Sequence, residues 1–259
     1  MRKNDEVLWL LEKYFLEFYY EDNELCSLII DWFDLAINIK AISFDIARYD
    51  DSLLYCGMAW DYEEERFKKL TAYNLELVKF HYIFGAFESL VKLLIPNDNI
   101  KKWGKVNAAC GWLKSHNIQD DLLDDYLRIY NETMSLLNEI KSHPQEFIQI
   151  EIEEKDYVDL SGKGLALAYK IRNLFAHGAL MMPSGYNEDE DKEAFEKMLT
   201  IFYNAQTLVI MTMIMLLLVD VKNDNEKCYD SVYLPEIDGL TQKEFLFNVY
   251  NEIIQLRIF

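Results

Sequence analysis

The sequence predicts an all-α fold with an antiparallel four-helix-bundle core and at most short β segments. Three observations support this prediction. Glycine and proline, which interrupt helices most often, occur only nine and four times in 259 residues. Hydrophobic residues make up 51% of the chain, enough for a sizeable core. Two long segments repeat apolar residues at alternating spacings of three and four, the period of one helix face.

The clearest helix is expected between Asp61 and Leu94. Gly85 is the only glycine in this segment, and the first proline is Pro96, which ends the helix. The spacing of its apolar residues is typical of a coiled-coil seam and predicts a buried face. The seam consists of Leu70, Tyr73, Leu77, Phe80, Phe84, Phe87, Val91 and Leu94.

A second long helix is expected from about Asp191 to Val221. Its seam contains one polar residue, Thr212, whose hydroxyl is expected to bond a carbonyl one turn earlier. The apolar stretch Thr207–Val219 is shorter than the roughly 20 residues that a membrane span needs. We therefore expect a buried core helix and no membrane association. The seam consists of Phe195, Met198, Phe202, Ala205, Val209, Thr212, Leu216 and Val219.

Shorter segments complete the predicted fold. Thr241 and Glu244 are expected to form a capping box at the start of the last helix. A loop with one short helix is expected between Pro96 and His116. Brief alternation allows short strands near residues 41–50 and 147–157. Further helices are expected near residues 5–20, 24–39, 120–141 and 164–178.

The sequence predicts three parts of the chain. Residues 1–58 form an N-terminal extension, residues 59–222 the helical bundle, and residues 223–259 a C-terminal helical tail. The formal net charge of −19 argues against broad, non-specific binding to nucleic acid or anionic membranes. The four cysteines are far apart and form no CxxC, so we expect reduced thiols and a cytoplasmic location.

The segment Ala168–Leu180, AYKIRNLFAHGAL, places an arginine, an asparagine and a histidine in a largely apolar helical segment. At about 100° per residue, Arg172 and His177 fall on the side opposite the core, with Asn173 and Leu165 between them. Such a face lacks the lysines and glutamates of a solvated surface. We therefore expect it to pack against the same face of a second copy. The core side consists of Leu167, Ile171, Leu174, Phe175 and Gly178.

The motif RNLFAH, Arg172–His177, resembles the Arg-x4–6-His signature of the HEPN superfamily. The segment FGAFESLVKLL, residues 84–94, resembles the family's first bundle helix, which carries an acidic residue. The resemblance covers about Asp61–Val221 and extends to defence and toxin subfamilies such as the Apea-like proteins. It implies a homodimeric, metal-independent endoribonuclease acting as a toxin or phage-defence effector, with a possible antitoxin or other regulatory protein as partner.

The same resemblance implies that Arg172 and His177 are catalytic and that Asn173 shapes the site. The chemistry suits these residues, because RNA carries its own nucleophile, the 2′-hydroxyl. A histidine can accept and donate protons near neutral pH, and an arginine can stabilise charge on a phosphate. No metal and no cofactor is expected, since the sequence has no HExxH, no paired Cys/His spacing and no glycine-rich phosphate loop.

Glu88 is the next candidate for the site. With Asn74 and His81 it recurs at seven-residue intervals beside the apolar seam. Glu88 is expected to orient Arg172 or Asn173 by a charge-assisted hydrogen bond. The alternative is a solvated stripe that flanks the core.

Residues 96–116 form a local basic segment in this acidic chain. It contains four lysines against one acid, Asp98, a balance of +3, with two tryptophans interleaved. Such a segment can hold single-stranded RNA by stacking and phosphate contacts, or it can be an ordinary loop whose tryptophans serve the core. The candidate RNA-binding residues are Lys101, Lys102 and Trp103, with Lys163 and Lys170 near the motif.

Two other hypotheses for the function compete with that of an enzyme. One is a non-catalytic HEPN-like module that binds RNA, a nucleotide or a protein partner. The other is a helical scaffold in which RNLFAH is accidental. One departure from some HEPN toxins is clear: those toxins carry a tyrosine two places after the histidine, and here Gly178 and then Ala179 follow His177.

Overall fold

The computed structural model describes residues 3–19, 23–43, 57–116, 118–141, 158–176, 189–221 and 227–255. Within these ranges the chain is helical, and the only β pairing is an isolated bridge between Lys227 and Thr241. The all-α prediction is therefore confirmed. The short strands expected near 41–50 and 147–157 fall mostly or wholly outside the described residues. The α-helices are α1 (Lys3–Phe18), α2 (Glu24–Asn38), α3 (Gly57–Leu94), α4 (Asn97–Trp103), α5 (Lys105–Ser115), α6 (Asp120–Lys141), α7 (Leu160–Ala176), α8 (Asp189–Asp220) and α9 (Gln242–Gln255).

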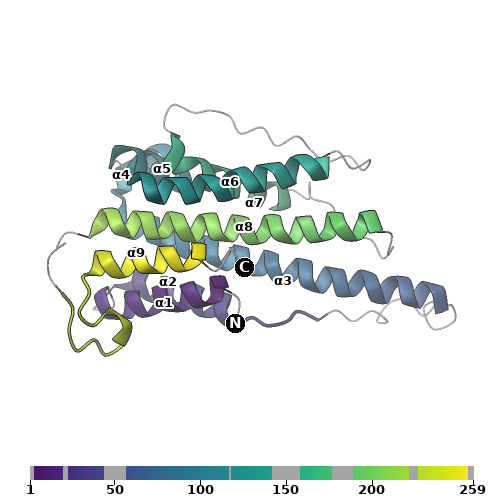
Figure 1. Ribbon diagram of the computed structural model, residues 1–259, viewed down its shortest axis with the longest axis horizontal. Coiled ribbons are helices and arrows are strands. Elements are labelled where there is room, and N and C mark those ends of the chain that lie inside the picture. The colour runs from purple at the N-terminus through teal and green to yellow at the C-terminus, as the bar shows by residue number, and fades with distance from the viewer. Residues whose placement is uncertain are drawn as a thin grey trace.

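Helix α8 runs through the middle of the molecule (Figure 1). Helices α4 to α7 lie on one side of it, and α1, α2, α3 and α9 lie on the other. Helix α8 packs against α3, α6 and α7 and also against α1, α5 and α9. The helices of the predicted bundle thus do meet around α8, but these contacts do not isolate four helices as a core of their own.

The apolar part of α8 is covered on every side. Residues 204–217 are all buried, because neighbouring helices surround this stretch. By length and composition alone Lys192–Asp220 could cross a membrane, but 89% of its most apolar stretch is buried inside the protein. The expected core helix is confirmed. The Thr212 hydroxyl donates to the Leu208 carbonyl at 2.7 Å, as the sequence predicts.

Helix α3 is 38 residues long and buries more than the predicted seam. Ile83, Ala86 and Leu90 lie beside the seam and are also buried, because α2 covers one side of α3 and α8 covers another. The approach of α2 is close at Gly85, where an added Cβ would lie 2.8 Å from the Trp32 ring. The ends of the seam are only half-buried.

The terminal helices share the main core. Buried side chains of α1, α2 and α9 belong to the same hydrophobic cluster as those of α3 and α8. Tyr14 of α1 donates to the side chain of Gln242 of α9 at 3.1 Å. The predicted capping box is present: the Thr241 amide donates to Glu244 at 2.8 Å, and the Glu244 amide donates to the Thr241 hydroxyl at 3.2 Å. The described helices of the expected N-terminal extension and C-terminal tail, α1, α2 and α9, therefore share one interior with α3 and α8.

The segment after Pro96 differs from the expected loop and single short helix. It forms two helices, α4 and α5, which meet at Gly104. Gly104 has a φ of 76°, a left-handed conformation that favours glycine. Its amide donates to the Ile100 carbonyl at 2.8 Å and closes α4. A single glycine therefore turns the chain sharply between two short helices, a local feature that apolar spacing does not reveal.

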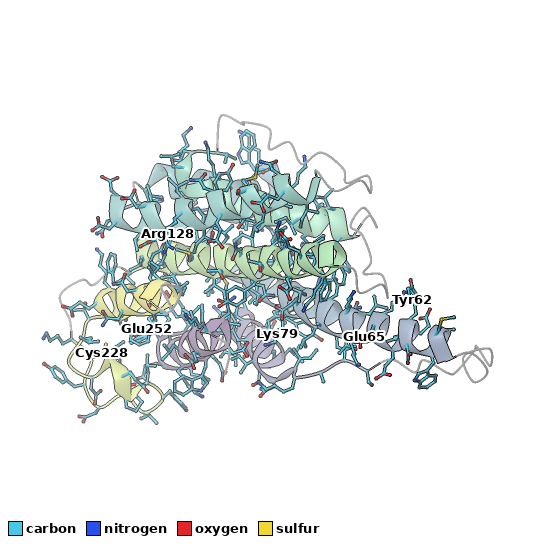
Figure 2. The ribbon with its side chains drawn as sticks, turned by 45° about the vertical axis from the view of Figure 1, so that its right-hand side comes forward. Tyr62, Glu65, Lys79, Arg128, Cys228 and Glu252 are labelled. Carbon is cyan, nitrogen blue, oxygen red and sulfur yellow. The ribbon has the colours of Figure 1, made fainter. Side chains whose placement is uncertain are left out.

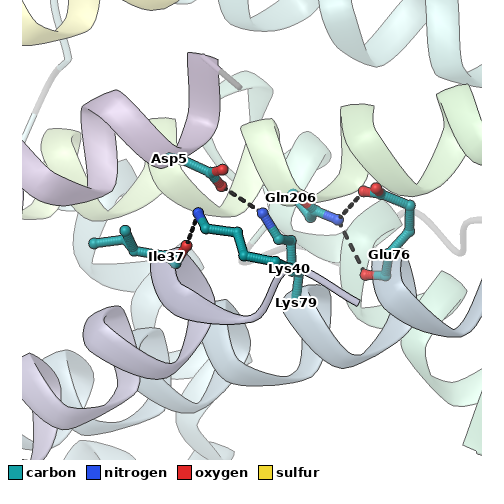
Figure 3. Close-up of polar contacts among 6 residues, drawn as sticks. All are labelled: Asp5, Ile37, Lys40, Glu76, Lys79 and Gln206. Carbon is teal, nitrogen blue, oxygen red and sulfur yellow. Dashed lines mark hydrogen bonds and ion pairs between the residues drawn. The ribbon is translucent and has the colours of Figure 1, made fainter. Parts of the chain in front are cut away.

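A buried polar cluster joins α1, α3 and α8 (Figure 3). Lys79 of α3 donates to Asp5 of α1 at 2.7 Å, and both side chains are almost fully buried. Gln206 of α8 donates to the backbone carbonyl of Glu76 at 3.1 Å and to its carboxylate at 3.0 Å. Lys79 lies among the helices (Figure 2), whereas Arg128 is exposed on α6.

The end of α2 lies next to this cluster (Figure 3). Lys40 donates to the carbonyl of Ile37 at 2.6 Å and so satisfies one of the free carbonyls at the end of the helix. The hydrogen bonds of Lys79 and Gln206 connect α3 to α1 and to α8 within the core.

Candidate functional site

The first half of α7 is fixed firmly in the core. An added Cβ on Gly164 would lie 2.6 Å from the ring of Tyr126 and 2.7 Å from the side chain of Leu208, so α6 and α8 approach α7 closely here. The amide of Leu165 donates to the Tyr126 hydroxyl at 2.7 Å, and that hydroxyl also bonds Thr212 at 3.1 Å. Burial raises the pKa of Tyr126, so it remains a neutral phenol. These contacts position the rest of α7.

Leu165 corrects the predicted helix face. The sequence places it opposite the core, but it is fully buried. The reason is that α5, α6 and α8 pack around the first half of α7 and cover the position of Leu165. The mixed face is confined to the second half, where Tyr169 is 39% exposed, Arg172 and Asn173 are half-buried, and Ala176 is exposed.

Arg172 joins α7 to α3. Its Nη1 donates to Glu88 Oε1 at 2.8 Å, and each side chain keeps 27% of its surface exposed. The second carboxylate oxygen of Glu88 accepts a short hydrogen bond from Lys105, the first residue of α5. The pairing of Glu88 with Arg172 is a contact that the sequence predicts, and it is confirmed. Three helices therefore meet at two cations and one carboxylate, a balance of +1.

The pKa of Glu88 reflects two opposing effects. Partial burial raises the pKa, but the hydrogen bonds and charges of Lys105 and Arg172 together outweigh it. The resulting pKa lies below the ordinary value, so Glu88 is a carboxylate at neutral pH. It can orient Arg172 but is a poor proton donor.

An aromatic surface supports the arginine. The guanidinium carbon of Arg172 lies 4.4 Å from the centre of the Phe84 ring, within cation–π distance. Phe84 also stacks with Tyr169, one turn before Arg172 on α7, with ring centres 6.1 Å apart. The guanidinium has five N–H donors and uses one on Glu88. Its position is thus fixed while donors remain for an anion.

The other residues of the motif are less constrained. Asn173 is half-buried beside Arg172 on α7. Among the described residues, the hydrogen-bonding partners of Glu88 are Arg172 and Lys105, so Asn173 does not share it. His177 follows the last residue of α7 and lies outside the described residues. The convergence of Arg172 and His177 on one phosphate therefore stays a prediction.

The predicted polar stripe on α3 does not act as one surface. Asn74 donates back to the Leu70 carbonyl of its own helix at 2.8 Å. His81 is exposed and meets the edge of Trp32 of α2, with ring centres 6.4 Å apart. Of the three residues, Glu88 is the one that reaches α7.

The candidate RNA-binding residues lie on two helices. Lys101, Lys102 and Trp103 are exposed at the end of α4, and the Lys102 ammonium lies 4.7 Å from the centre of the Trp103 ring. Lys163 and Lys170 are half-buried on α7. Lys105 belongs to the basic segment and donates to Glu88. The basic segment and the Arg172 site are therefore adjacent. Within the described residues, no group of three or more His, Cys, Asp or Glu side chains could hold a metal ion.

Two contacts of this site were missed by sequence reasoning. Phe84 stands one turn before Glu88, so a residue that binds Glu88 can lie over its ring, and the spacing of four was a usable signal. No spacing in the sequence indicated that Lys105 would contact Glu88. Its approach to Glu88 depends on the turn at Gly104, which reverses the chain between α4 and α5.

Comparisons with known proteins add nothing to this geometry. No family model, no curated protein and no solved structure matches the chain. The function is therefore inferred from the sequence motif and from the contacts of its residues.

Proposed function

We propose that this chain is a metal-independent endoribonuclease of the HEPN type that acts as a homodimer. Arg172 and His177 are its catalytic residues, Glu88 and Asn173 shape the site, and the cellular role is that of a toxin or defence effector. The observation that carries the proposal is the contact of Arg172 with Glu88 at 2.8 Å, which orients a partly exposed guanidinium five residues before His177.

The proposed chemistry uses only groups of the protein and of RNA. His177 takes the proton of the 2′-hydroxyl, and the 2′-oxygen attacks the adjacent phosphorus. The bond from phosphorus to the 5′-oxygen then breaks, and that oxygen takes a proton from the histidine of the second subunit. Arg172 stabilises the negative charge that develops on the phosphate oxygens. The products are a 2′,3′-cyclic phosphate and a 5′-hydroxyl end.

One observation favours a second candidate function. Glu88 carries hydrogen bonds from both Arg172 and Lys105, so much of the local positive charge is already neutralised. A site of this kind suits a module that binds RNA, a nucleotide or a protein partner without cleaving it. Measurements of RNA cleavage and of RNA binding distinguish the two functions.

The deciding experiment measures RNA cleavage in the presence of a metal chelator. Arg172→Ala and His177→Ala are each expected to lower the cleavage rate by about 100-fold or more, because each removes a group required in the transition state. Matched controls are Arg128→Ala and His81→Ala, since both residues are exposed and lie outside the site. The controls should cleave at the rate of the original protein.

Three further results decide between the candidates. Equal cleavage by the original protein and both site variants would end the enzyme proposal. Binding of RNA without cleavage of any RNA tested would favour the module. Sedimentation equilibrium should find a dimer at micromolar concentration, and a monomer would contradict the shared site.

A further inference from the structure

A cavity of about 260 Å³ opens between α4 and α5. It exists because Gly104, with its φ of 76°, folds the two short helices against each other. The side chains that matter for its chemistry are two tryptophans, two asparagines and a serine, and Gly111 leaves part of the wall open. The lining includes Trp103, Trp112, Asn99, Asn107, Gly111 and Ser115.

The two tryptophans provide flat apolar surfaces at different depths. Trp112 is half-buried and packs against the core, and the ring of His116 lies 4.5 Å from its centre. Trp103 is 46% exposed, which is a large apolar surface to leave in water. A flat, aromatic ligand that stacks in the cavity would cover this surface, and every nucleobase has a suitable face.

Polar groups on the wall can recognise the edge of a base. The side-chain amide of Asn107 donates to the Trp103 carbonyl at 2.9 Å, which holds the amide in place and leaves its oxygen as an acceptor. Ser115 donates to the Trp112 carbonyl at 2.8 Å, and its hydroxyl oxygen also lies 3.0 Å from Nδ1 of His116, so the hydroxyl is held in place. Fixed acceptors and hydroxyls beside stacking surfaces are the features with which proteins bind unpaired bases.

The surroundings suit the backbone of a single strand. Lys101 and Lys102 are exposed at the rim, and the Lys102 ammonium lies over Trp103. On the same helix as Asn107, Lys105 contacts Glu88 and so reaches the Arg172 site. Helix α5 therefore contributes residues to the cavity and also carries Lys105, which contacts the Arg172 site, so one strand of RNA can contact both.

The size of the cavity limits the ligand. Pockets for drug-sized molecules usually measure about 300–1,000 Å³, so 260 Å³ is suited to one ring system rather than a whole cofactor. In a duplex the bases are paired and stacked on each other, so their faces are not available. The ligand chemistry is that of one unpaired base with its phosphates near lysines.

We propose that the cavity between α4 and α5 binds one unpaired nucleobase of single-stranded RNA, next to the Arg172 site. This inference rests on the proposed function in that the strand held here is the one cleaved there. It assigns the substrate class as single-stranded RNA, and Trp103, Trp112 and Asn107 as the residues that hold the base.

The test measures binding of a fluorescent eight-nucleotide RNA by anisotropy, in the His177→Ala background so that the RNA stays intact. Removing a stacking tryptophan, as in Trp103→Ala, is expected to weaken binding about 5- to 150-fold. Gly111→Leu should weaken binding at least about tenfold, because a Cβ at Gly111 meets only open space and the side chain fills the cavity. Gly57→Leu is the matched control, since a Cβ there also meets open space and α3 begins far along the chain.

Two comparison ligands separate stacking from charge. A strand with the same backbone but no bases, and a duplex of the same sequence, should each bind at least about tenfold more weakly than the single strand. Thermal unfolding of each variant shows whether it is folded, and Gly111→Ala provides a milder filling of the same cavity. Equal affinity for the strand without bases, or equal effects of Gly111→Leu and Gly57→Leu, would overturn the proposal.

The two proposals fail in different ways. If cavity variants bind RNA normally while Arg172→Ala abolishes cleavage, the base cavity is wrong and the ribonuclease stands. If cavity variants lose binding while Arg172→Ala and His177→Ala leave cleavage unchanged, the cavity stands and the ribonuclease is wrong.

Discussion

Several ion pairs join the described helices of this protein, and two of them differ in depth more than in chemistry. Asp5 and Lys79 pair at 2.7 Å with side chains 7% and 5% exposed. Glu88 and Arg172 pair at 2.8 Å with both side chains 27% exposed. In each pair a carboxylate of one helix meets a cation of another, yet one pair lies inside the core and the other at its edge.

The surroundings of the two pairs indicate different uses. The hydrogen bond of Asp5 with Lys79 lies next to that of Glu76 with Gln206, and both lie between helices (Figure 3). Such a buried pair must keep both partners, because an unpaired charge in the core is very costly. Arg172 instead retains N–H donors near water, and a half-exposed cation can exchange its contacts for a phosphate. Depth thus separates a structural ion pair from a candidate site.

The largest expected effect concerns the buried pair. Lys79→Met leaves Asp5 buried without its cation, and we expect the free energy of unfolding to fall by about 3–5 kcal/mol. Urea denaturation measures this loss. The double variant Asp5→Leu with Lys79→Met should recover most of the stability, because both charges are gone. A loss below about 1 kcal/mol in the single variant would mean that water reaches this pair.

The second effect tests what positions Arg172. Gly164→Ala places a Cβ against Tyr126 and Leu208, and overpacking of this kind costs about 1–3 kcal/mol. Because the same contacts hold α7, we also expect slower RNA cleavage than in the control Gly57→Ala, whose Cβ meets open space. Urea denaturation and the cleavage rate are measured together. Unchanged stability would show that α6 and α8 do not confine α7 here.

The smallest effect concerns the half-exposed pair. Glu88→Gln removes the charge that orients Arg172, and we expect a loss of about 1 kcal/mol in the free energy of unfolding at neutral pH. The increase in the activation free energy of cleavage should exceed the loss in the free energy of unfolding, because the arginine loses its orientation. The control is Asp125→Asn, which removes the carboxylate that pairs with the exposed Arg128 at 3.1 Å.

The pH dependence of this variant has a definite sign. The pKa of Glu88 is lowered in the folded protein, so its contribution is present above the unfolded value of about 4.3 and is lost as the pH falls through the folded value. Glutamine does not titrate. The stability difference between the original protein and Glu88→Gln should therefore be largest near neutral pH and shrink in acid. A difference that grows below about pH 4 would contradict the lowered pKa.

Local chemistry explains which features were predictable. The capping box of Thr241 and Glu244 and the back-bond of Thr212 each involve residues within one helical turn. The end of α3 at Leu94 followed from Pro96, whereas the helix begins at Gly57, four residues before the expected Asp61. A bond from Glu88 to Arg172 or Asn173 was also expected, with a solvated stripe as the alternative, and the structure has the bond to Arg172.

Long-range packing explains what was not predictable. Leu165 is buried although the wheel of α7 places it outside, because three helices pack around that half of α7 and cover this position. Lys105 reaches Glu88 only through the turn at Gly104. Asp5, near the start of the chain, meets Lys79, 74 residues later, and no spacing rule connects them.

By itself, therefore, the sequence determined the helical class, most helix positions and the motif Arg172–His177, because these depend on residues one or two turns apart. Only the tertiary structure decided that α8 lies at the centre, that the terminal helices join one core, and that α5 brings Lys105 to Glu88. The physical reason is that a helix wheel defines the faces of one helix, whereas the number of neighbours that cover those faces depends on the whole packing.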